Sequence, residues 1–173
     1  MTAYDYLLRG NEYHRLGGVT LDNPRKAVKW FERAIAADPN YGLAYAWRVC
    51  AASWLPDFDF DENMKYIQKA IELDENEAET HRIMGVMQRL NGDFKTAEYH
   101  FRRAIELNPS DAYIKARSAA FYTYKGEPTR ALELIEAAVT NDPFLPVWCI
   151  EERGVALFAL QRFEEAISAL GAM

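Results

Sequence analysis

The stretch "AIELNPSDAY" at residues 104–113 has close counterparts elsewhere in the chain. They are "AIAADPNYGL" at 34–43, "AIELDENEAE" at 70–79 and "AAVTNDPFLP" at 137–146. The alanines that align in these stretches, Ala34, Ala70, Ala104 and Ala138, are separated by 36, 34 and 34 residues. Self-similarity at a nearly fixed period of this size is typical of a repeat architecture, in which each copy forms one supersecondary unit.

Other positions follow the same period. Three residues before each aligned alanine the chain carries a large apolar residue, namely Phe31, Ile67, Phe101 and Ile135. In "FKTAEYHFRRAIEL" (94–107) the apolar residues recur at steps of three and four, which predicts an amphipathic helix. A preceding helix in each unit has a small residue near its middle, namely Gly10, Gly85, Ala119 or Gly154. Small residues let two antiparallel helices approach to about 8–10 Å, so the pattern predicts stacked helical hairpins.

Helix boundaries are indicated by short polar signals. Gly92 followed by Asp93 predicts a helix end and then a capping carboxylate. Asn23-Pro24 and Gly126-Glu127-Pro128 have a polar residue before a proline, which predicts a cap and a proline in the first helical turn. In "DFDFDEN" (57–63) we expect Asp61 to cap the next helix.

These residues resemble the tetratricopeptide repeat, a helix-turn-helix unit of about 34 residues. Residues 78–111 match its pattern through Gly85, Ala97, Phe101, Ala104 and Pro109, and residues 112–145 match it through Ala119, Tyr122, Ala131, Ala138 and Pro143. The resemblance implies an all-α, right-handed superhelical solenoid of antiparallel helix pairs. It also implies a single domain over 1–173, with units at about 3–41, 42–77, 78–111 and 112–145 and an incomplete unit at 147–173.

The first unit departs from the pattern, because 17 residues separate Gly10 from Ala27 where the family has 12. The insertion falls in "LGGVTLDNPR" (16–25). This long first unit, over residues 3–47, is similar to bacterial tetratricopeptide regions fused to class III adenylate or guanylate cyclases or to winged-helix regulators. That resemblance implies a regulatory region of a larger bacterial signalling protein, and it carries over no catalytic residue.

Composition narrows the classes of function. The net charge of −6 argues against a nonspecific nucleic-acid binder and against a binder of anionic membranes, because both need a positive face. The first residues lack the pattern of a signal peptide, and no apolar run approaches the roughly 20 residues that span a bilayer. Cys50 and Cys149 form no CxxC pair. We therefore expect a cytoplasmic protein with reduced thiols.

No motif indicates catalysis. Asp57, Asp59 and Asp61 alternate as at the start of a calcium-binding EF-hand loop, but Glu62 and Gln68 stand where that loop needs glycine and a bidentate glutamate. The three histidines show no ligand spacing, and the chain has no phosphate-binding loop. The sequence thus predicts no enzyme activity, no cofactor and no metal site.

In the family that the chain resembles, the first helix of each unit lines a concave groove. Mapping its positions onto the sequence gives candidate partner-binding residues, namely Asn11, Trp47, Trp54, Arg82, Arg89, Tyr113, Arg117, Tyr124 and Trp148. Aromatic residues and arginines are frequent binding anchors, so we expect a protein or peptide partner with apolar and acidic side chains. The alternative is that these aromatics only pack between repeats.

The end of the chain carries an apolar stripe of Ile167, Leu170 and Met173. Terminal repeats usually present a polar face, so the stripe predicts either a longer natural chain or a homodimer through the incomplete last repeat.

Overall fold

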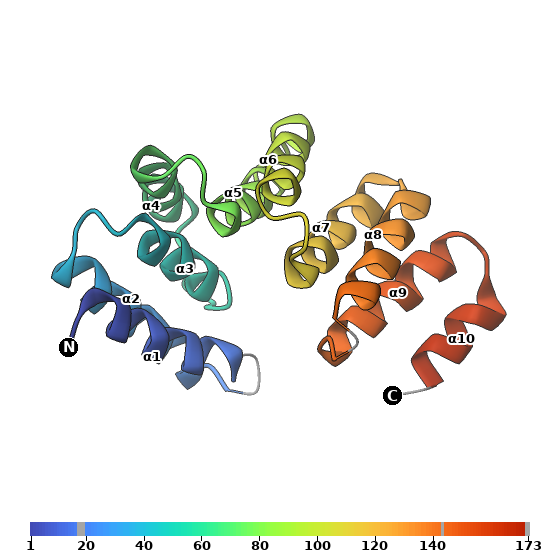
Figure 1. Ribbon diagram of the computed structural model, residues 1–173, viewed down its shortest axis with the longest axis horizontal. Coiled ribbons are helices and arrows are strands. Elements are labelled where there is room, and N and C mark those ends of the chain that lie inside the picture. The colour runs from blue at the N-terminus through green and yellow to red at the C-terminus, as the bar shows by residue number, and fades with distance from the viewer. Residues whose placement is uncertain (17–19, 143, 172–173) are drawn as a thin grey trace. The chain divides into compact units, whose positions relative to one another are not determined.

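The computed structural model describes residues 1–16, 20–142 and 144–171, and these residues form ten α-helices and no β-strand (Figure 1). The helices are α1 (Ala3–Arg15), α2 (Asp22–Ala37), α3 (Gly42–Ala52), α4 (Phe60–Leu73), α5 (Ala78–Leu90), α6 (Phe94–Leu107), α7 (Ala112–Lys125), α8 (Pro128–Asn141), α9 (Val147–Ala159) and α10 (Phe163–Gly171). None of these helices is long and apolar enough to cross a bilayer.

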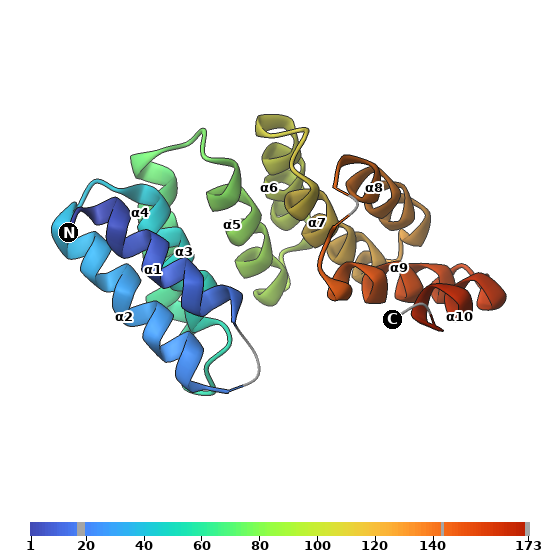
Figure 2. The same cartoon turned by 60° about the horizontal axis from the view of Figure 1, so that its bottom comes forward.

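Consecutive helices pair as hairpins, as α1 with α2 and α7 with α8 show in two views (Figures 1 and 2). The contacts of the chain cluster into two compact units, Met1–Met87 and Gln88–Met173, so the boundary falls near the end of α5. Each unit is described by itself. The single domain over 1–173 stays a prediction.

The first unit is built around the large residue of each second helix. Phe31 of α2 is 0% exposed and packs with Leu7 of α1 and the small Ala44 of α3. Ile67 of α4 is also 0% exposed and packs with Val49 of α3 and with the α5 residues Ile83, Met84 and Met87. The residues that repeat in the sequence therefore form the interior, because each hairpin buries its apolar face against the next one.

The second unit repeats this arrangement. Phe101 of α6 and Ile135 of α8 are 1% and 0% exposed. The Phe101 ring lies 4.8 Å from that of Phe121 in α7, measured between centroids. Leu157 of α9 packs with the small residues of α10, so the last hairpin also closes on an apolar seam.

Two of the predicted boundaries are confirmed. Gly92 has φ +80°, a left-handed conformation that favours glycine, and the Asp93 side chain accepts a hydrogen bond of 3.0 Å from the backbone N–H of Thr96. Gly126 ends α7 with φ +86°, and Pro128 occupies the first turn of α8. Glu127 stands at the cap position, but its side chain makes no capping hydrogen bond.

Two other boundary predictions are wrong. Asn23 is not a cap, because α2 already begins at Asp22 with Leu21 before it, and the Asn23 amide donates instead to the Leu16 carbonyl at 3.3 Å. Asp61 lies inside the first turn of α4, and the cap is Asp59, whose carboxylate accepts from the Glu62 N–H at 2.9 Å. The inserted residues 17–19, the repeat proline Pro143 and Met173 lie outside the described residues.

The α1–α2 hairpin depends on a residue without a side chain. A Cβ atom on Gly10 would lie 2.6 Å from Cδ1 and 2.8 Å from Cζ of Phe31, closer than van der Waals contact allows. Phe31 is fully buried, so its ring has no space to move into. Gly10→Ala should therefore lower the free energy of unfolding by about 1–3 kcal/mol, although alanine is the better helix former.

Urea denaturation of the two proteins measures the difference. Gly171→Ala is the matched control, because a Cβ atom there meets nothing within 4 Å. Equal destabilisation by both changes would contradict the role assigned to Gly10.

Candidate partner-binding surface

Three of the candidate residues come together in the second unit, on the first helices α7 and α9. Arg117 lies one helical turn after Tyr113 on α7, and its guanidinium carbon is 3.8 Å from the ring centroid of Trp148 on α9. The Tyr113 and Trp148 rings meet edge to face with centroids 5.6 Å apart. All three side chains are half-buried, so the cluster forms a partly exposed corner of two aromatic rings and one cation.

A carboxyl group and a thiol lie near this corner on α9. Burial raises the pKa of Glu152, and the positive charge of Arg117 acts in the opposite direction. Burial also raises the pKa of the Cys149 thiol to about 12, again opposed by Arg117. Cys149 is 1% exposed, so it contributes to the interior, whereas Glu152 is half-buried at the edge of the corner.

A second arginine–aromatic contact lies within the same unit. Arg89, near the end of α5, has its guanidinium 5.2 Å from the ring centroid of Tyr124 on α7. Tyr124 is 73% exposed, so most of its ring remains available to another molecule. The second unit therefore brings five of the nine predicted site residues into two clusters of arginine and aromatic side chains.

Arg82 behaves differently from these two arginines. It lies in the first unit, is 3% exposed, and binds the Glu79 carboxylate through Nε at 2.9 Å and Nη2 at 2.7 Å. Its Nη2 also lies 3.6 Å from the Cys50 sulfur, and the His14 ring nitrogen Nε2 lies 3.2 Å from the same sulfur. A guanidinium held in this way is satisfied within the unit and is closed to a partner.

The other candidate residues of the first unit differ in how far they are exposed to solvent. Trp47 is half-buried between His14 and Phe31, with ring centroids at 5.1 and 6.4 Å. Asn11 keeps a buried amide oxygen that accepts no hydrogen bond from the described residues. Trp54 follows the end of α3 and is 47% exposed. Trp47 thus packs within its unit, and Trp54 is the most accessible of the three.

Sequence reasoning did not identify the polar cluster inside the first unit. Arg48 of α3 is 7% exposed and donates to the Asn63 amide oxygen at 2.7 Å, and its Nη2 lies 3.3 Å from the Glu62 carboxylate. Its guanidinium also stacks 4.1 Å from the ring centroid of Tyr66. The signal was present, because Asn63 stands where the other units have alanine, and a buried amide there needs a polar partner.

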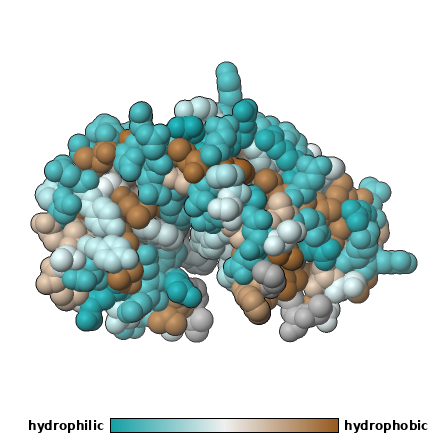
Figure 3. All heavy atoms as spheres, in the orientation of Figure 1, coloured by the Kyte–Doolittle hydropathy of each residue, from teal (hydrophilic) through white to brown (hydrophobic). Residues whose placement is uncertain are grey.

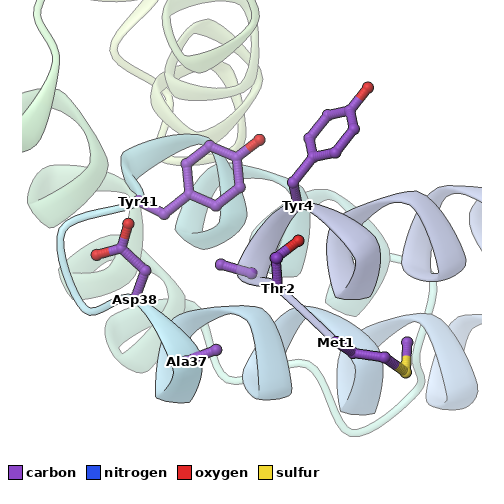
Figure 4. Close-up of a pocket in the computed structure, with 7 residues that line it drawn as sticks. Met1, Thr2, Tyr4, Ala37, Asp38 and Tyr41 are labelled. Carbon is purple, nitrogen blue, oxygen red and sulfur yellow. The ribbon is translucent and has the colours of Figure 1, made fainter.

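A shallow hollow of about 590 Å³ opens at the start of α1, lined by Tyr4, Ala37, Asp38, Tyr41 and residues 1–3 (Figure 4). Figure 4 shows the Tyr4 and Tyr41 rings on the same side of it. Burial raises the pKa of Tyr41, and the nearby acidic groups add to that effect. The hollow is open to solvent and brings together no acid–base pair suited to catalysis.

Two acids of the "DFDFDEN" segment (57–63) have structural roles. Asp57 forms an exposed ion pair with Arg25 at 3.3 Å, and Asp59 caps α4. Across residues 1–16, 20–142 and 144–171, no three side chains of the types His, Cys, Asp and Glu are grouped closely enough to hold a metal ion.

The buried pair of Arg82 and Glu79 supports a stability test. Arg82→Ala would leave the Glu79 carboxylate, which is only 12% exposed, without its closest cation. We expect a loss of about 3 kcal/mol in the free energy of unfolding, at the low end for breaking a buried ion pair because Glu79 keeps some contact with water.

The matched control is Arg25→Ala. Its ion pair with Asp57 has side chains 48% and 64% exposed, so we expect a change below about 1 kcal/mol. Thermal or urea unfolding distinguishes the two variants. If Arg82→Ala were as stable as Arg25→Ala, the buried pair of Arg82 and Glu79 would not contribute to the stability of the unit as expected.

The chain is similar to tetratricopeptide repeat proteins, in sequence over part of its length and in fold over nearly all of it. Residues 91–146 match the family model of the tetratricopeptide repeat. The chain resembles the crystal structure of TTC0263, a thermophilic TPR protein of Thermus thermophilus, with a TM-score of 0.79 and 16% identity over 97% of this chain and 88% of that one. It also resembles YrrB, a TPR protein with an unusual peptide-binding site, with a TM-score of 0.58 and 18% identity over 95% of this chain and 84% of that one.

Among curated proteins, protein bimA of Emericella nidulans is 27% identical over 89 residues, which are 51% of this chain and 11% of bimA. The chain thus matches a small part of that relative. With the solved structures, these results confirm the predicted fold class, an all-α repeat of antiparallel helix pairs as in TPR proteins. The predicted fusion to a cyclase or a winged-helix regulator is untested.

Proposed function

We propose that this chain is a non-catalytic scaffold that binds a segment of a partner protein on the exposed faces of its first helices. Proteins of the tetratricopeptide fold generally mediate protein–protein interaction, and the resemblance to a peptide-binding TPR protein supports the proposal. The proposed partner segment carries apolar and acidic side chains.

The exposed apolar side chains of α7 and α9 carry the proposal. Tyr124 of α7 is 73% exposed, and Val155 and Phe158 of α9 are 50% and 66% exposed. Helices α7 and α9 contact each other, and we call the exposed side chains of these two helices, together with the Arg117 corner, the α7–α9 face. Apolar side chains that remain exposed beside arginines suit a protein partner.

Exposed apolar side chains alone do not identify this face as a binding surface, because they also occur elsewhere on both units. Figure 3 shows apolar side chains among hydrophilic ones over both units, as on most protein surfaces. The α7–α9 face combines exposed aromatics with arginine on two first helices, which is the usual composition of binding anchors. The similar contacts of Arg9 and Arg33 with Trp30 involve a second helix, α2.

Selection from a displayed random-peptide library against the full chain tests the proposal. We expect enriched peptides that bind the wild-type protein and lose about tenfold or more in affinity on Tyr124→Ala, because an exposed aromatic anchor commonly contributes more than about 1.4 kcal/mol.

Tyr99→Ala is the control, since Tyr99 is 60% exposed but lies on α6, a second helix. It should bind the same peptides as the wild type. A library that gives no binder, or binders insensitive to Tyr124→Ala, would refute binding on this face.

We further propose that the last hairpin forms a homodimer. The large residues of the four earlier second helices are 0–1% exposed, namely Phe31, Ile67, Phe101 and Ile135. Leu170 stands at the equivalent place in α10 and is 40% exposed, and nearby Ile167 is 71% exposed. In the earlier repeats, a following helix helps to cover this position. A second copy of α10 would supply such a cover.

Light scattering tests the dimer. Ile167→Glu should convert a dimeric wild-type protein into a monomer without loss of melting temperature, because Ile167 is largely solvated within its own chain. The control is Val139→Glu, a change at a 39% exposed apolar residue of α8. A monomeric wild-type protein would refute the dimer.

Two further expectations remain proposals. The chain is proposed to be the regulatory region of a larger bacterial signalling protein, possessing an output domain such as a cyclase or a winged-helix domain. What supports this is the long connection between α1, which ends at Arg15, and α2, which begins at Asp22. The extent of the encoding reading frame tests it. The cytoplasmic location is likewise a prediction from the sequence.

A further inference from the structure

Most arginines of the second unit form an ion pair with a carboxylate of the same unit. The pairs include Arg130–Glu98 at 2.9 Å, Arg153–Glu136 at 2.7 Å and Arg162–Glu165 at 2.6 Å. Arg117 is an exception, because it forms no ion pair and no hydrogen bond with any residue that the structure describes. Its guanidinium is nevertheless held in place, by stacking on Trp148 at 3.8 Å.

Stacking on Trp148 leaves the hydrogen-bond donors of Arg117 available. A guanidinium that stacks on a ring uses its flat face, whereas its five N–H donors project in its own plane. The Tyr113 ring, 5.3 Å away, forms a second wall and restricts the rotation of the group. Arg117 is therefore oriented in advance for a planar, two-oxygen acceptor, and a carboxylate is the acceptor that matches this fork.

We infer that the corner formed by Tyr113, Arg117 and Trp148 is the subsite that binds a carboxylate of the partner segment. This inference rests on the function proposed above and adds to it the chemical group that the corner recognises. The carboxylate can belong to an aspartate or glutamate side chain or to the end of a chain, because both present the same two oxygens. An apolar neighbour of the acid would lie along Val155 and Tyr124 on the same face.

The other arginines with aromatic or ionic contacts are less suited. Arg9 and Arg33 in the first unit both lie over one ring, that of Trp30, at 5.4 and 4.4 Å, so each has a single aromatic wall. Arg82 and Arg48 in the first unit are buried and bound to Glu79 and to Asn63 and Glu62. Arg89 has one aromatic neighbour at 5.2 Å and no second wall among the described residues. Arg117 is the one of these that combines partial exposure, two aromatic walls and unused donors.

The charges of the chain restrict where an acidic segment can bind. The chain has a net charge of −6, so an acidic segment is repelled at long range and binds only where a specific cation outweighs that repulsion. Glu152 on α9 interacts electrostatically with Arg117 without forming an ion pair with it. An incoming carboxylate therefore competes with Glu152 for the same positive charge.

The test starts from peptides selected on the full chain and uses one enriched acidic peptide with its matched amide, Glu or Asp replaced by Gln or Asn. For the wild-type protein, loss of the acid should weaken binding by about tenfold to a hundredfold, the range of a charge-assisted hydrogen-bonded pair. For Arg117→Gln, the acid and the amide should bind within about twofold of each other. A pair of peptides with free and amidated C-termini assigns the carboxylate to a side chain or to the chain end.

Arg162→Gln is the matched control. Arg162 is an exposed arginine of the same unit, but it has its own carboxylate in Glu165, so the variant should discriminate between acid and amide as the wild type does. Persistence of the discrimination in Arg117→Gln would overturn the inference, as would enriched peptides that bind equally well without their acid.

Glu152→Gln gives a second, independent measurement that does not depend on the folding of the Arg117 variant. Removal of the competing charge should strengthen the binding of the acidic peptide by about fivefold and leave that of the amide unchanged. An unchanged or weaker acid affinity would count against the corner. If the library yields no binder at all, the proposed function fails and the inference fails with it, whereas charge-independent binders remove the inference alone.

Discussion

The close approach of two helices over a small residue is the constraint on which the hairpins depend, and it is tightest where that residue is glycine. At Gly10 the ring of Phe31 occupies the space that a Cβ atom would need, and at Gly154 the side chain of Leu170 does the same. The aligned alanines Ala34 and Ala104 are 0% exposed for the same reason. Because the inner faces of the hairpins are fixed by this packing, the outer faces of the first helices can vary in sequence without loss of the fold.

This constraint explains which parts of the structure were predictable. A packing requirement that recurs in every unit selects the same residue type at a fixed spacing, so Phe31, Ile67, Phe101 and Ile135 could be identified as interior from the sequence alone. A helix cap is a local choice among adjacent polar residues. Where one candidate followed a glycine, at Asp93, the prediction was right, and where several acids alternate, at residues 57–61, the sequence could not tell that Asp59 rather than Asp61 caps α4.

The sequence predicted which helices carry the candidate residues, but it did not predict which of their arginines are already bound by a neighbouring carboxylate. Family positions placed Arg82 and Arg117 on first helices, and both do lie there. Their surroundings differ, because Glu79 stands three residues before Arg82, at the spacing at which side chains on a helix meet, whereas Tyr113 stands four residues before Arg117. An acid at that spacing satisfies the arginine within its own helix, and an aromatic residue supports it without satisfying it. Neighbours at these spacings are visible in the sequence, and they distinguish a satisfied arginine from one that is only supported.

The polar cluster of Arg48 and Asn63 shows why the units are not interchangeable. In the other hairpins the position of Asn63 holds alanine, and Ala27, Ala97 and Ala131 are 0% exposed. Without Arg48 the buried Asn63 amide oxygen would lose its donor, and without Asn63 the Arg48 guanidinium would lose its shortest hydrogen bond and keep only the carboxylates of Glu62 and Glu32. We interpret the pair as a register device, because sliding α3 and α4 against each other by one turn would separate Nη1 of Arg48 from Oδ1 of Asn63. An interface of apolar side chains alone would lose no hydrogen bond on such a shift. The pair therefore favours the packing of α4 against α3 over other helices with similar apolar patterns.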